Sequence, residues 1–174
     1  MQRLIKSKKG SLTLVFSYYL ISFFLAYLVT INVNLSGWLL ILIWHITATL
    51  FIFLFSFIHN NSSIYDPFWH LAPIPIVFFI ANQSPLPNLE LNLVLSAFLF
   101  WALRLTYNWF LNWTNLYHED FRYIDLKDNN KFIAFINDLF GIHLIPTLIV
   151  NASLYPIYLA LTSDSINNLV YIGF

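Results

Sequence analysis

Long apolar runs alternate with short polar turns along the whole chain. Residues 12–31 and 37–58 contain no Asp, Glu, Lys or Arg and are separated by a short polar turn. A helix that crosses the roughly 30 Å hydrocarbon core of a bilayer needs about 20 mostly apolar residues, so both runs predict transmembrane helices. The first run follows a basic stretch, as a signal peptide does, but it is too long for one and no A-x-A cleavage site follows it. We therefore interpret it as a retained anchor.

The next two runs are less regular. Residues 89–113 are long enough to cross a bilayer although they contain Arg104. Residues 68–81 would form only about 21 Å of helix, and they include Pro73 and Pro75. This pattern predicts either a short kinked span or a re-entrant segment.

The last run, residues 132–161, is too long for one straight crossing. Its first part, through residue 140, alternates apolar and polar positions, which favours a place at the membrane interface. We expect residues 141–161 to cross the membrane, with a bend at Pro146 or Pro156.

The positions of the basic residues favour five crossings. Cytoplasmic loops of membrane proteins are enriched in Lys and Arg. With five spans and a cytoplasmic N-terminus, all basic residues but Arg104 lie on the inner side: Arg3, Lys6, Lys8, Lys9, Arg122, Lys127 and Lys131. If residues 68–81 did not cross, three of these basic residues, Arg122, Lys127 and Lys131, would lie outside. The sequence thus predicts an all-α, multi-pass bundle of about five spans in the cell's inner (plasma) membrane.

The predicted organisation is a single membrane domain with two short flanks. Residues 1–11 form a basic cytoplasmic N-terminus and residues 12–161 form the membrane domain. Residues 162–174 form a tail that starts a further apolar stretch.

The composition agrees and excludes several function classes. Apolar residues make up 59% of the chain and charged residues 9%, against roughly 25% charged residues in soluble domains, which excludes a soluble enzyme and a disordered chain. Eight basic and eight acidic residues balance, so no net charge attracts nucleic acid. The absence of Cys excludes disulfides and Cys-ligated metals, and four Gly leave no room for a glycine-rich phosphate loop.

Arg104 is the clearest candidate for function, because an ionisable residue within a span is costly and usually functional. Asn108 and Asn112 follow at four-residue intervals and share its helix face. One interpretation is a cation in an inward-opening polar groove that receives an anionic or carbonyl group. The other is an arginine that pairs with Asp66 or Asp138 and ties helices together.

Two other spans carry similar polar ladders. His143, Thr147 and Asn151 recur at four-residue intervals, and His45 precedes Thr49 by four. For His45 we favour an ordinary helix–helix hydrogen bond. His143 lies closer to the other polar groups, so a functional role stands beside the structural one.

Two loop segments combine acidic, aromatic and imidazole groups: Tyr-Asp-Pro-Phe-Trp-His at 65–70 and His-Glu-Asp-Phe-Arg-Tyr at 118–123. Such groups can donate a proton and orient one another, or they can form an interfacial aromatic belt with solvated charges. The H-E-x-x-H zinc motif fails because Arg122 stands where its second His is needed. We predict no metal site.

Four segments together resemble a known family: residues 65–73, 101–109, 118–123 and 140–147. In this order they resemble uncharacterised bacterial membrane proteins, with a domain of unknown function, of the steroid 5α-reductase superfamily. The resemblance covers about residues 60–160.

The resemblance implies a helical membrane fold similar to reductases that use NADPH to saturate an enone or polyprenyl double bond. The substrate would be a lipid, sterol-like or isoprenoid. The residues that fall on the family's recurring motif positions are the catalytic candidates: Arg104, Tyr107, Asn108, Glu119, Asp120, Arg122 and Tyr123. Candidates for substrate binding are Tyr65, Asp66, Trp69 and His143.

The chain also departs from the family. Its members continue into helices with an Arg-His-Pro-Asn-Tyr-like stretch that helps to bind the cofactor, whereas this chain has no Arg-His or His-Pro pair. We therefore expect it to resemble only the N-terminal portion, to be inactive alone and to bind NADPH weakly. It would be either a truncated or frame-shifted gene product, or one half of a split protein with a separately encoded C-terminal half as a partner. The alternative is a non-enzymatic membrane scaffold or a subunit of a larger complex.

Overall fold

The described part of the protein consists of helices and the turns that connect them. The computed structural model describes residues 7–127 and 130–165, so Arg3, Lys6 and the tail after residue 165 lie outside the described residues. Within that part there is no strand, and the all-α prediction is confirmed. The elements are α2 (Lys8–Thr30), α3 (Gly37–His59), η1 (Ser62–Ile64), α4 (Phe68–Leu71), α5 (Pro73–Ala81), α6 (Asn88–Asn112), α7 (Phe121–Leu126), α8 (Lys131–Ile136), η2 (Asn137–Leu144), α9 (Ile145–Ser153) and α10 (Tyr155–Thr162).

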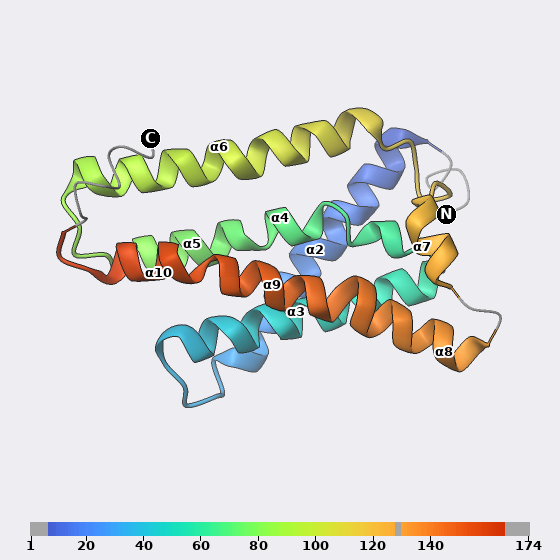
Figure 1. Ribbon diagram of the computed structural model, residues 1–174, viewed down its shortest axis with the longest axis horizontal. Coiled ribbons are helices and arrows are strands. Elements are labelled where there is room, and N and C mark those ends of the chain that lie inside the picture. Colours follow the sequence, from blue (N-terminus) through green and yellow to red (C-terminus); the bar gives the residue numbers. More distant parts are fainter. Residues whose placement is uncertain (1–6, 128–129, 166–174) are drawn as a thin grey trace.

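Among the described residues, five helical runs are long and apolar enough to cross a membrane, which confirms the predicted multi-pass bundle. They comprise Lys8–Thr30, Gly37–His59, Ser62–Ala81, Asn88–Asn112 and Lys131–Thr162. Successive runs reverse direction along the bundle (Figure 1). Large apolar side chains such as Leu20, Phe57 and Phe100 are exposed on its outside, as expected for a surface solvated by lipid rather than water.

Helices α2 and α3 form the most extensive helix pair. The buried positions Ser22, Ala26 and Ala48 carry small side chains, which allow helix backbones in a membrane to approach closely. Nearer the other end of the pair, the rings of Tyr18 and Phe55 stack at 4.1 Å.

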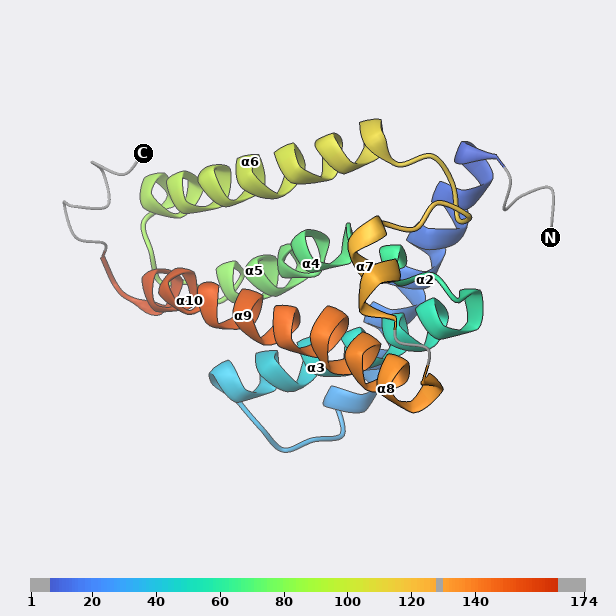
Figure 2. The same cartoon turned by 45° about the vertical axis from the view of Figure 1, so that its right-hand side comes forward.

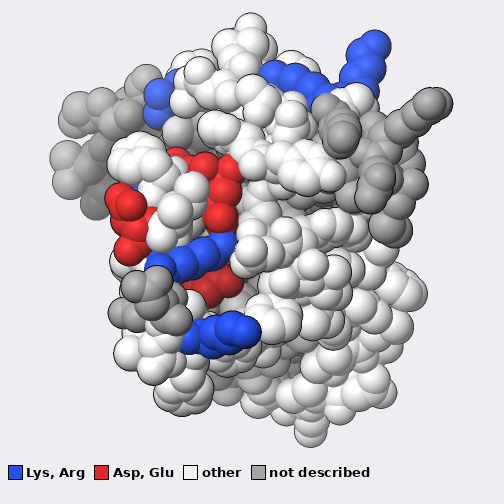
Figure 3. Space-filling model, turned by 90° about the vertical axis from the view of Figure 1, so that its right-hand side faces the viewer, with Lys and Arg blue, Asp and Glu red and all other residues white. Residues whose placement is uncertain are grey.

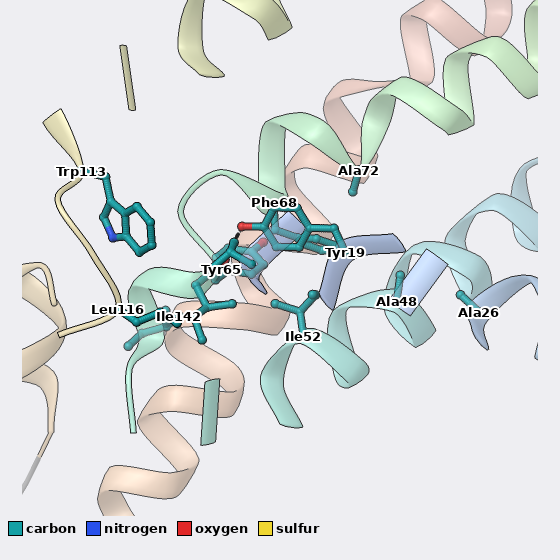
Figure 4. Close-up of a cluster of buried hydrophobic side chains, with 12 residues drawn as sticks. Tyr19, Ala26, Ala48, Ile52, Tyr65, Phe68, Ala72, Trp113, Leu116 and Ile142 are labelled. Carbon is teal, nitrogen blue, oxygen red and sulfur yellow. Dashed lines mark hydrogen bonds between the residues drawn. The ribbon is translucent and has the colours of Figure 1, made fainter. Parts of the chain in front are cut away.

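The third run, from η1 through α5, is the most deeply buried of the five. Figure 4 shows Tyr65, Phe68 and Ala72 of this run in a core shared with Tyr19 of α2, whose hydroxyl donates to the Ile64 carbonyl at 2.6 Å. The run begins at residue 62 rather than at the predicted residue 68. It is interrupted between α4 and α5, where the missing N–H of proline makes α5 begin a new helix.

The fifth run is a series of helical turns over Lys131–Thr162. Its prolines, Pro146 and Pro156, lie in the first turns of α9 and α10, where the missing N–H needs no partner. The segment that we expected at the interface, residues 132–140, is continuous with this run and leads into the π-helical turns of η2.

One end of the bundle gathers most of the charges. It is formed by the turn after α3, the segment between α6 and α7, and the helices α7 and α8, with α7 lying between the end of α6 and α8 (Figure 2). We call it the charged end and define it by Asp66, Glu119, Asp120, Arg122, Lys127 and Asp138. Figure 3 shows acidic and basic side chains side by side on this face.

Candidate functional site at the charged end

The turn after α3 is hydrogen-bonded to the segment that follows α6 at the charged end. Asn60 ends α3 at a φ of 49°, a left-handed conformation that Asn adopts more readily than most residues. Asn61 accepts the N–H of Ser63 at 2.9 Å and donates to the carbonyls of Leu116 at 2.6 Å and His118 at 3.2 Å. The turn is therefore bound to the segment that follows α6, more than fifty residues later.

The largely buried carboxylate of Glu119 binds the backbone of this turn. Its Oε1 accepts the backbone N–H of Ser62 at 2.7 Å and the ammonium of Lys127 at 2.6 Å, and only 14% of its side chain is exposed. Lys127 also donates to the Asn60 carbonyl at 3.3 Å. The carboxylate thus satisfies a buried donor while a cation neutralises its charge.

Asp120 caps α7 and holds Arg122. One carboxylate oxygen accepts the N–H and the Nε of Arg122 at 2.9 Å, and the other accepts Nη2 at 2.8 Å. The hydrogen bonds from Arg122 lower the pKa of Asp120, and those to Asp120 raise the pKa of Arg122. The guanidinium lies 5.9 Å from the ring centroid of Tyr123. Backbone N–H of Asp120 donates to the Ser63 hydroxyl at 2.8 Å.

Tyr123 and Asp66 form a hydrogen-bonded pair between α7 and the turn before α4. The Tyr123 hydroxyl donates to Asp66 Oδ1. Burial, followed by the Asp66 charge, raises the pKa of Tyr123, so the phenol keeps its proton. The pair joins one catalytic candidate and one substrate-binding candidate into a single unit.

Asp138 and His143 are buried in η2. They are five residues apart, a spacing that shares one face in π-helical turns. His143 Nδ1 lies 2.9 Å from the carbonyl of Asp138 and 3.3 Å from its Oδ1. Because a carbonyl only accepts, Nδ1 is the protonated nitrogen, and Nε2 faces the Ser56 hydroxyl at 3.1 Å. Asp138 Oδ1 accepts from the Ser62 hydroxyl at 2.8 Å.

Three buried hydroxyls continue from this network into the core. The hydroxyl oxygen of Tyr65 lies 2.8 Å from that of Thr147, and the Thr147 oxygen lies 2.9 Å from that of Thr49. Thr49 donates to the His45 carbonyl at 2.9 Å. Since each hydroxyl has one proton, the chain runs from Tyr65 to Thr147 to Thr49. The Tyr65 ring lies 4.9 Å from that of His143.

A cavity of about 320 Å³ opens beside these groups. Its lining combines three aromatic side chains with aliphatic ones. Gly141 leaves space open, because a Cβ added there would meet no atom within 4 Å. The lining residues are Tyr65, Trp69, Tyr123, Leu126, Gly141, Ile142, Pro146, Ile149 and Val150.

The predicted site residues therefore fall into two groups. Most lie at the charged end, and Tyr65, Trp69 and Tyr123 reach the cavity. Arg104, Tyr107 and Asn108 lie elsewhere, exposed on α6. Among the described residues Arg104 forms no ion pair, because Asp66 binds Tyr123 and Asp138 binds Ser62 and His143.

The cavity lining contains no basic side chain that could bind the phosphates of a dinucleotide. Two basic side chains of the charged end are paired with carboxylates, Arg122 with Asp120 and Lys127 with Glu119. Arg104 lies on the outside of α6. Nor do the described residues contain a group of three His, Cys, Asp or Glu side chains that could hold a metal.

Sequence reasoning did not single out several residues of this site. Ser56, Ser62 and Lys127 complete its hydrogen bonds, and Gly141 shapes the cavity. The Asn-Asn-Ser-Ser stretch at 60–63 was the available signal, since such residues favour caps and turns.

Comparison with known proteins gives one family. A family model described as protein of unknown function (DUF1295) matches residues 52–174. The matched region contains all the site residues that the sequence predicted and the whole cavity lining. Neither a curated protein nor a solved structure matches the chain.

Proposed function

The chain belongs to the DUF1295 family of proteins of unknown function, and on that premise we propose that it binds a lipid substrate in the cavity beside Tyr123. In this proposal it is the substrate-binding part of a membrane reductase that saturates a carbon–carbon double bond, as the resemblance to steroid 5α-reductases implies. The charged end faces the cytoplasm, in agreement with the basic residues at that end.

The cavity beside the Tyr123–Asp66 pair is the observation that carries the proposal. Its walls are mostly apolar and aromatic, as in sites that bury most of a small ligand. About 320 Å³ accommodates the head of a sterol-like or isoprenoid lipid rather than a whole phospholipid. Trp69 and Tyr123 offer flat surfaces for a conjugated group.

Tyr123 supplies the polar chemistry. Tyr65 already donates its proton to Thr147, whereas the Tyr123 proton points to a carboxylate that can itself take up a proton. When Asp66 is protonated, it donates to the Tyr123 oxygen and the phenol proton turns to the carbonyl oxygen of a bound enone. This hydrogen bond withdraws electrons from the conjugated double bond and prepares it for reduction.

The proposal gives this chain the substrate side of the reaction only. NADPH is the cofactor that the resemblance implies, and Arg122 and Lys127 of the charged end are paired with carboxylates. A separately encoded partner would provide the dinucleotide site. The hydrogen bond from Tyr123 to the enone forms wherever the cofactor binds.

The test is binding of a sterol that carries a conjugated enone, with the saturated alcohol as the comparison ligand. The full chain in lipid nanodiscs is titrated while tryptophan fluorescence is recorded. We expect saturable binding of the enone, weakened about five- to tenfold by Tyr123→Phe, as expected for one hydrogen bond. Tyr117→Phe is the matched control, because Tyr117 is exposed outside the cavity. Equal affinity for both ligands, or none for the enone, contradicts the proposal.

A second candidate is a non-enzymatic scaffold, favoured by the mutual pairing of the site's charges. Glu119 and Lys127 bind each other from the two ends of α7 and both bond the turn after α3, whereas Asp120 and Arg122 pair within the first turn of α7. A scaffold predicts that substitutions at these pairs lower abundance in the membrane, and that no ligand fills the cavity. The enone titration separates the two functions.

A further inference from the structure

An exposed ridge of polar residues runs along α6. Its members recur every four residues and all are exposed: Asn92, Ser96, Phe100, Arg104, Asn108 and Asn112. Only Phe100 is apolar. The opposite face, with Val94, Phe98 and Ala102, is buried against the bundle.

Helix α6 stands at the edge of the bundle. It packs on one side against α4, α5 and α10, and it is the least buried of the five runs. Figures 1 and 2 show it as an outer layer whose far side no other described element covers along its middle. The middle of the ridge, around Arg104, therefore faces away from the other described helices.

Arg104 makes this ridge unsuited to hydrocarbon. It lies four residues, about 6 Å, past the midpoint of α6, and its guanidinium has neither a hydrogen bond nor an ion pair with any described residue. Cations at such a depth almost always face a partner or a water-filled cavity. The cavity of the candidate site does not include Arg104.

We propose that the ridge is a docking surface for another transmembrane helix, one that bears a carboxylate at the level of Arg104. Rows of residues four apart form the ridges that interdigitate in the commonest class of helix packing. Amide and hydroxyl groups such as Asn108 and Ser96 hydrogen-bond between helices in lipid. A carboxylate on the partner helix would neutralise the guanidinium of Arg104.

The charge pattern selects this partner over two others. A second copy in the same orientation would place Arg104 against Arg104, which repels. A lipid phosphate would meet the guanidinium only at the membrane surface, because α6 continues about 12 Å past Arg104 to Asn112. A polar helix that crosses α6 near Arg104 meets the acid's partner and adjacent members of the row such as Asn108.

The test uses the absence of Cys from the natural chain. The full chain with Ser96→Cys is co-expressed with a Leu/Ala transmembrane probe helix that carries one Cys and either Glu, Gln or Lys at the level of Arg104. The yield of disulfide-linked product is measured in membranes. We expect several-fold more product with Glu than with Lys, and the reverse order when Arg104→Glu is added.

Two controls make the outcome decisive. Leu20→Cys places the thiol on an exposed position of α2 and should give no preference among the probes. If Arg104→Glu does not accumulate in the membrane, Arg104→Gln should abolish the difference between Glu and Lys. Equal yields for all three probes, or a preference that anionic lipid added to the membranes removes, overturn the proposal. This inference does not depend on ligand binding in the cavity.

Discussion

The hydroxyl of Tyr123 donates a hydrogen bond to the carboxylate of Asp66, 57 residues earlier in the chain. Tyr123 lies on α7 and lines the cavity, and Asp66 lies between η1 and α4 within the most buried run, so the bond fixes a lining residue to the core. It couples the stability of the charged end to the shape of the candidate site.

Replacing Tyr123 by Phe should lower the free energy of unfolding by about 1–3 kcal/mol, because a partly buried carboxylate loses a donor. Chemical unfolding in detergent micelles measures the change. Tyr117→Phe, at an exposed ring, should stay within about 0.5 kcal/mol of the natural protein. Equal effects of the two substitutions would show that the bond contributes nothing.

Gly141 should tolerate a small side chain and reject a large one. A Cβ at this position meets no atom within 4 Å, so Gly141→Ala should keep ligand binding and raise helix stability by up to about 1 kcal/mol. Gly141→Phe should fill the cavity and abolish enone binding while the protein still folds. Titration of both variants checks this, and enone binding by Gly141→Phe would show that the ligand lies elsewhere.

The apolar runs predicted the fold because spanning helices need length and hydrophobicity, and both can be read from the sequence. The beginning of the third run could not be read in this way. Ser62 and Ser63 look like loop residues, yet both are buried, where Glu119, Asp138 and the backbone of Asp120 satisfy them. Partners so distant in the chain are invisible to hydropathy.

The sequence did not show how the candidate site residues are grouped in space. Helical periodicity correctly places Arg104 and Asn108 on one face, but it does not show which face turns inward. The buried face of α6 is instead the apolar one. The Tyr123–Asp66 pair likewise depends on how the turn after α3 packs against α7, which local patterns do not encode. The catalytic roles of these residues stay predictions.

The two ion pairs of the charged end should differ in strength. The Glu119–Lys127 pair is mostly buried, whereas the Arg122 side chain is 64% exposed. A double-mutant cycle with alanine at Glu119 and Lys127 should give a coupling energy of about 1.5–3 kcal/mol. The matched cycle at Asp120 and Arg122 should give at most about 1 kcal/mol, the usual range for exposed pairs. A larger coupling for the second pair would reverse this assignment.

The exposed pair should nevertheless leave a signature in the pH dependence of stability. Hydrogen bonds from Arg122 hold the pKa of Asp120 below its ordinary value of 3.8. The folded protein therefore binds this proton less readily than the unfolded chain, so the stabilisation is present above about pH 4 and is lost as the pH falls through the folded-state pKa. The difference in unfolding free energy between the natural protein and Arg122→Gln should be constant at neutral pH and vanish in acid. Unfolding curves of both proteins between neutral pH and pH 2 measure this difference. As a control, the effect of Arg122→Gln is measured again in a protein that also carries Asp120→Asn, where it should no longer depend on pH. A difference that grows on acidification would mean that Arg122 stabilises the fold through contacts other than Asp120.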